Sequence, residues 1–67
     1  MDTLSESQIL NIVDQAVEYG VKLLKAKNAM ALGFASVWID GYIAGNKNLS
    51  ENDIKSLRAT IEAYKFF

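Results

Sequence analysis

The side chains that could carry out chemistry are few in this sequence of 67 residues, and histidine and cysteine are absent. Without them the sequence lacks the commonest general base, the reactive thiol and the usual zinc ligands. Carboxylates that lie close in sequence, such as Asp14 with Glu18 and Glu51 with Asp53, fall on positions that we expect to face solvent. We therefore predict a protein that is not an enzyme and that holds no metal and no cofactor.

Asp40 is the one ionisable residue in the stretch from Ala29 to Gly45. In one interpretation it is a buried carboxylate or an acceptor for a partner's lysine or arginine. In the other, the small or polar residues at 29, 33, 36, 40 and 44 form the solvent face of a helix. We favour the second because an isolated buried carboxylate is costly. If Asp40 is instead a buried carboxylate or an acceptor, a ligand site would combine Asp40 and Ser36 with Lys25 and Lys27.

The middle of the sequence carries three rows of large apolar side chains at helical spacing. They are Leu32 with Ile39 and Ile43, Met30 with Phe34, and Trp38 with Tyr42. The first two rows are enough for a core within one chain, so we predict that Trp38 and Tyr42 anchor a subunit interface, where Trp and Tyr are energetically favoured. The predicted interface residues are Met30, Phe34, Trp38, Tyr42, Phe66 and Phe67. The terminal pair either folds back onto the bundle or docks as a hook into a neighbouring subunit or a target groove.

The lysines give little indication of a nucleic-acid surface. Lys22, Lys25 and Lys27 cluster near the C-terminal end of the first predicted helix. The helix dipole stabilises positive charges at that end. Seven lysines and arginines are balanced by eight acidic residues, which gives a net charge of −1. Binding to nucleic acid is therefore not expected, although a phosphate ligand at this helix end remains open.

Three helices must position these side chains, and we predict them over residues 6–27, 29–44 and 51–66. The first and third each begin after a serine that can cap the helix, at Ser5 and Ser50. Gly45 is expected to stop the second helix as its C′ residue. The first helix has an apolar arc of roughly 200°, wide enough to face two neighbours. Gly20 lies in the middle of this arc and predicts a close approach between helices.

The second helix is too apolar to be covered within one chain. Its only charge is Asp40, and a helix that is apolar over most of its circumference must be covered nearly all round. A chain this short also has a thin stability margin and contains no cysteine for a disulfide. We predict an all-α, up-down-up three-helix bundle, one domain over residues 1–67, that forms a homodimer or higher oligomer through the second helix.

Function is less constrained than architecture. The leading hypothesis is a small cytoplasmic interaction protein, a regulator, adaptor or inhibitor of the kind that phage or bacterial genomes encode, which acts as a homo-oligomer and binds another protein. The first alternative is an oligomer that holds a small molecule or nucleotide between its subunits. The second is a small membrane-active protein, which we do not favour because the apolar run from Ala29 to Gly45 is shorter than the ~20 residues of a membrane span.

Overall fold

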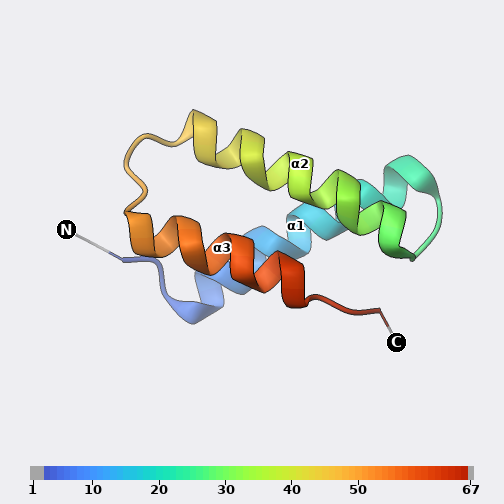
Figure 1. Ribbon diagram of the computed structural model, residues 1–67, viewed down its shortest axis with the longest axis horizontal. Helices are drawn as coiled ribbons and strands as arrows, with labels where there is room; N and C mark the ends of the chain where they lie inside the picture. The colour runs from blue at the N-terminus through green and yellow to red at the C-terminus, as the bar shows by residue number, and fades with distance from the viewer. Residues whose placement is uncertain (1–2, 67) are drawn as a thin grey trace.

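The computed structural model describes residues 3–66 and confirms an all-helical bundle of three helices in that part of the chain. Helix α1 spans Glu6–Leu24, α2 spans Ala29–Gly45 and α3 spans Glu51–Ala63. Figure 1 shows three helices that alternate in direction along the long axis of the molecule, with α1 behind α2 and α3. Each helix packs against the other two, and the molecule measures 38 × 22 × 14 Å.

Both predicted helix starts are confirmed. The Ser5 side chain accepts a hydrogen bond from the backbone N–H of Gln8 at 3.1 Å, and the Gln8 side chain accepts one from the backbone N–H of Ser5 at 2.8 Å. Ser50 caps α3 in the same way, accepting from the backbone N–H of Asp53 at 3.1 Å. Asn28 supplies the cap of α2, with its side-chain oxygen accepting from Met30 and Ala31. At each of the three starts, a local side chain accepts from one or two of the free N–H groups.

The predicted helix ends were wrong at three places. Helix α1 ends at Leu24 rather than residue 27, because Lys25 turns into the left-handed region at φ 60° while its N–H bonds to the Val21 carbonyl. Helix α3 ends at Ala63 rather than residue 66, since Tyr64 is extended. Gly45 is the last residue of α2 and has no positive φ, so it is not the predicted left-handed stop. Instead, the Asn46 side chain donates to the carbonyl oxygen of Tyr42 at 2.8 Å.

The core is formed by one stripe of buried side chains from each of the three helices. Helix α1 contributes the largest share, and its predicted contact with two neighbours is confirmed. The buried apolar residues are Ile9, Ile12, Val13, Ala16 and Val17 of α1, Ala31, Ala35 and Ile39 of α2, and Leu57 and Ile61 of α3. Helix α2 therefore presents small side chains to the core over much of its length.

The close approach predicted at Gly20 is present. Gly20 is buried, and a Cβ atom added to it would collide with the carbonyl oxygen of Ala31 and lie 3.3 Å from the backbone nitrogen of Ala35. Helices α1 and α2 thus meet almost backbone to backbone, which only a glycine facing two alanines allows.

Asp53 does not face solvent, contrary to the prediction. It is 2% exposed, and its Oδ1 accepts a hydrogen bond from the backbone N–H of Leu4 at 3.0 Å. This bond joins the first turn of α3 to the segment that leads into α1, and it satisfies a backbone donor that lies beside the core.

Candidate functional site

One side of α2 exposes large apolar side chains. Met30 is 65% exposed, Val37 67% and Phe34 36%. At about 100° per residue these three side chains share one side of the helix with Gly41 and, at its edge, Trp38. We call these five residues the apolar face of α2. It contains no charged residue, and patches of this kind on small soluble proteins often mark binding sites.

The apolar face of α2 continues onto α1. A shallow depression between the two helices is lined by Tyr19, Val37, Trp38, Gly41 and Tyr42. Tyr19 is 45% exposed, and Leu23, one turn further along α1, is 54% exposed. The exposed apolar surface is therefore contiguous across two helices.

The small residues of α2 are the reason that its large residues point outward. Ala31, Ala35 and Ile39 follow at steps of four residues and are buried, and Ala31 and Ala35 lie beside Gly20 of α1. Because they occupy the inward side, Met30 and Phe34 turn away from it. The assignment of these two residues to a core row was wrong, and their assignment to an interface stays a prediction. The spacing of the two alanines and their match to Gly20 could have revealed the inward side, since small residues favour close helix packing.

Trp38 and Tyr42 stand between the core and the surface. Both are partly buried and pack against the core, and their rings stack with centroids 5.7 Å apart and an interplanar angle of 12°. They also line the depression beside Gly41. Both rings thus close the core while they remain partly exposed.

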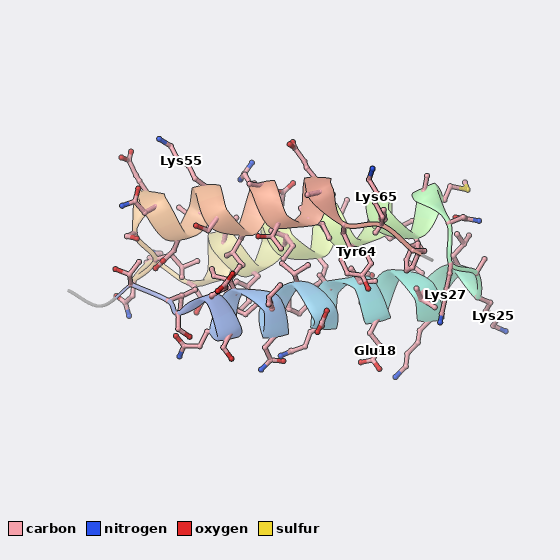
Figure 2. All side chains as sticks on the ribbon, turned by 90° about the horizontal axis from the view of Figure 1, so that it is seen from below. Glu18, Lys25, Lys27, Lys55, Tyr64 and Lys65 are labelled. Atoms are coloured by element: carbon pink, nitrogen blue, oxygen red, sulfur yellow. The ribbon has the colours of Figure 1, made fainter. Side chains whose placement is uncertain are left out.

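The four predicted ligand-binding residues do not meet in one chain. Asp40 and Ser36 line one shallow depression, where Asp40 is exposed and lies 3.4 Å from the guanidinium group of Arg58. The interpretation that Asp40 lies on the solvent face of α2 is therefore confirmed. Lys25 is the C-cap residue that follows α1, and Lys27 lies in the loop after it. Both are at the end of the bundle where α1 passes to α2 (Figure 2).

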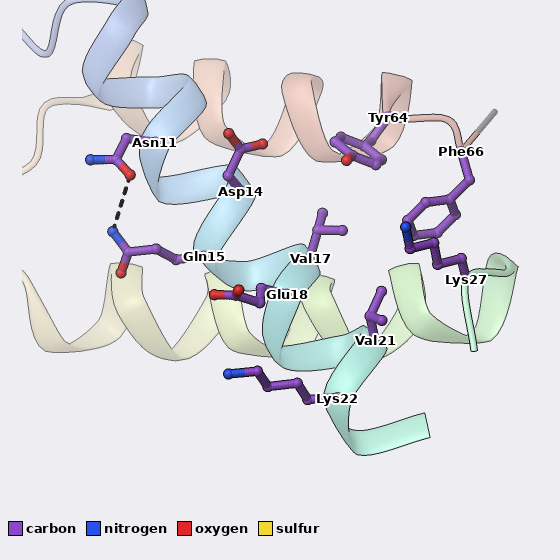
Figure 3. A pocket seen from close by; sticks show the side chains of 10 residues that line it. All are labelled: Asn11, Asp14, Gln15, Val17, Glu18, Val21, Lys22, Lys27, Tyr64 and Phe66. Atoms are coloured by element: carbon purple, nitrogen blue, oxygen red, sulfur yellow. Dashed lines mark hydrogen bonds between the residues drawn. The ribbon is translucent and has the colours of Figure 1, made fainter. Parts of the chain in front are cut away.

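A groove of about 540 Å³ runs between α1 and the segment that follows α3. Figure 3 shows Val17, Val21, Tyr64 and Phe66 facing it, with Lys27 beside Phe66. Tyr64 and Phe66 meet edge to face, with ring centroids 5.4 Å apart. Of the two alternatives for the terminal pair, Phe66 folds back onto its own chain, and Phe67 lies outside the described residues. The groove carries charges of both signs on its rim, from Asp14, Glu18, Lys22 and Lys27.

Within residues 3–66, no three acidic side chains come together in a group that could hold a metal ion. Over the same residues, no helix has both the length and the apolarity needed to cross a bilayer. No known protein family matches the chain, and comparison with curated proteins and with solved structures gives no match.

Proposed function

We propose that this chain is a non-enzymatic protein-interaction module that assembles into a homo-oligomer through α2. The observation that carries the proposal is the apolar face of α2, which is exposed and uncharged although α2 itself is firmly packed against α1 through the opposite side. The assembled protein then acts as a regulator, adaptor or inhibitor by occupying the surface of another protein. Its place in the cytoplasm stays a prediction.

The size of the exposed surface supports association. Tyr19 and Leu23, together with Met30, Phe34 and Val37 of the apolar face of α2, are each 36–67% exposed, and contiguous exposed apolar patches often mark interaction sites. A standard interface buries about 800 Å² per partner, including its polar rim. Five exposed large apolar side chains can form the centre of such an interface.

The position of Trp38 and Tyr42 supports the same proposal. Their stacked rings are held in place by the core on one side, so little conformational freedom is lost when the other side is covered. Rigid aromatic side chains at the edge of an apolar surface are the usual anchors of protein interfaces.

The other two hypotheses have less support. A ligand site between subunits needs a second copy to bring Lys25 or Lys27 toward Asp40, because these residues lie apart in one chain. A membrane-active protein would use the same apolar face of α2 on a lipid surface. Thermal stabilisation by a nucleotide would favour the ligand-binding oligomer, and binding to lipid vesicles would favour the membrane-active protein.

Light scattering coupled to size-exclusion chromatography tests the proposal. The wild-type chain is expected to have the mass of a dimer or higher oligomer, and Val37→Asp is expected to be monomeric with unchanged helical circular dichroism. Leu10→Asp is the matched control, because Leu10 is 49% exposed on α1 but does not line the depression beside the apolar face of α2. A wild-type monomer at roughly 100 µM, where even weak interactions are populated, contradicts the proposal.

A further inference from the structure

The apolar face of α2 changes in side-chain size along the helix. Its first half carries the large side chains Met30 and Phe34, and its second half carries Gly41, followed one turn later by Gly45. Val37 and Trp38 lie in between. At about 100° per residue, all six positions fall within an arc of roughly 100°. One side of a single helix thus offers two large projections and then two gaps.

No contact within the described part of the chain explains why residue 41 is a glycine. A Cβ atom added to Gly41 would meet nothing within 4 Å, and the residue has no positive φ. Glycine in the middle of a helix is less favourable than alanine, so an interior glycine usually has a packing reason. For Gly20 that reason is the backbone of Ala31. Gly33 is equally open, but Gly41 lies on the exposed apolar face of α2, where a group from outside the described residues can approach it.

Resting on the proposed self-association, we infer that α2 of a second copy packs antiparallel on this face around a two-fold axis between Val37 and Trp38. In this register Phe34 lies opposite the partner's Gly41 and Met30 lies opposite the partner's Gly45. The pairs follow from the axis alone, because residues 34 and 41, and residues 30 and 45, are equally distant from it along the helix. Each large side chain then fills the gap left by a glycine.

A second copy fits this face better than a different partner does. A two-fold interface requires a surface that is complementary to itself, and large residues at one end with glycines at the other meet that condition. The face carries no charge that could select an oppositely charged partner. A parallel pair would instead place Phe34 on the partner's Phe34 and leave the glycines facing each other across an empty space.

Cysteine cross-linking tests the register, because the natural chain contains no cysteine. A mixture of Phe34→Cys chains and Gly41→Cys chains is expected to form a disulfide-linked dimer under mild oxidation. Phe34→Cys alone is not expected to do so, since seven residues of helix separate the two sites by roughly 10 Å, beyond the ~7 Å between Cα atoms that a disulfide spans. Cross-linking of Phe34→Cys alone, without the mixed product, overturns the register in favour of a parallel pair.

Filling the gap is the second test and needs no cysteine. Gly41→Leu is expected to weaken association about tenfold or more, while the folded monomer keeps its helical content because the space around Gly41 is open. Gly33→Leu is the control, since Gly33 is also open but lies about 80° away from Gly41 around the helix. Equal dissociation constants for Gly41→Leu and wild type overturn the inference.

The two proposals fail in different ways. A monomeric wild type removes both the self-association and the register. An oligomer that Val37→Asp dissociates but Gly41→Leu does not keeps the self-association and removes only the antiparallel register.

Discussion

Gly20→Ala tests whether the contact between α1 and α2 depends on the absence of a side chain. The added methyl group would collide with the carbonyl oxygen of Ala31 and lie 3.0 Å from its carbonyl carbon. Both atoms belong to the backbone of α2, so no flexible side chain can move away. The two helices would have to separate, which loosens the packing of Ala31 and Ala35 that now excludes water.

The size of the effect follows from two opposing terms. Overpacking of a well-packed core costs about 1–3 kcal/mol, and a contact with rigid backbone falls at the upper end. The better helix propensity of alanine returns up to about 1 kcal/mol. The net loss is about 2 kcal/mol, out of a total stability of roughly 3–10 kcal/mol for a chain of this length. At about 4–8 °C per kcal/mol, the melting temperature falls by about 10 °C.

Thermal and urea unfolding followed by circular dichroism measure this change. Gly33→Ala is the matched control, because a Cβ atom there meets nothing within 4 Å, and it is expected to raise stability by about 0.5–1 kcal/mol. Each protein should be melted over a range of concentrations, since association raises the apparent stability. If Gly20→Ala is as stable as wild type, the backbone contact between α1 and α2 is not as close as we describe.

Three further substitutions probe the contacts at the helix starts and on the surface. Asp53→Ala removes the acceptor of the Leu4 N–H and is expected to lower the free energy of unfolding by about 1–3 kcal/mol in urea titrations; an unchanged midpoint would show that water replaces the carboxylate. Ser5→Ala is expected to cost about 1 kcal/mol, with faster hydrogen exchange confined to the first turn of α1, and uniform exchange would argue against a local cap. Asp40→Asn breaks the ion pair with Arg58 but is expected to change stability by less than about 0.5 kcal/mol, because both side chains are more than half exposed; a larger loss would assign the pair a structural role.

The sequence pattern was sufficient to predict those features that depend on interactions between residues close in the sequence. The caps at Ser5 and Ser50 join groups three residues apart, so the residue types alone predict them. The close approach at Gly20 was also predictable, because a glycine in the middle of an apolar stripe favours a near neighbour whatever that neighbour is. The number and order of the helices follow from the same local information.

The end of α3 and the role of Asp53 required contacts between distant parts of the chain. Asp53 looks like an ordinary first-turn acid, and only its bond to Leu4, 49 residues away, shows that it is buried. The early end of α3 likewise depends on the C-terminal segment, where Tyr64 and Phe66 line the groove with α1. No pattern within a single helix contains these contacts.

The orientation of α2 separates most clearly what the sequence determined from what the tertiary structure decided. The sequence predicted that α2 is apolar over most of its circumference, with the strip around Asp40 as its solvent face, but it left open which apolar row faces inward. The direction was decided by Gly20, against which only Ala31 and Ala35 could fit. With Ala31 and Ala35 on the inward side, Met30, Phe34 and Val37 face outward, because they lie on a different side of the same helix.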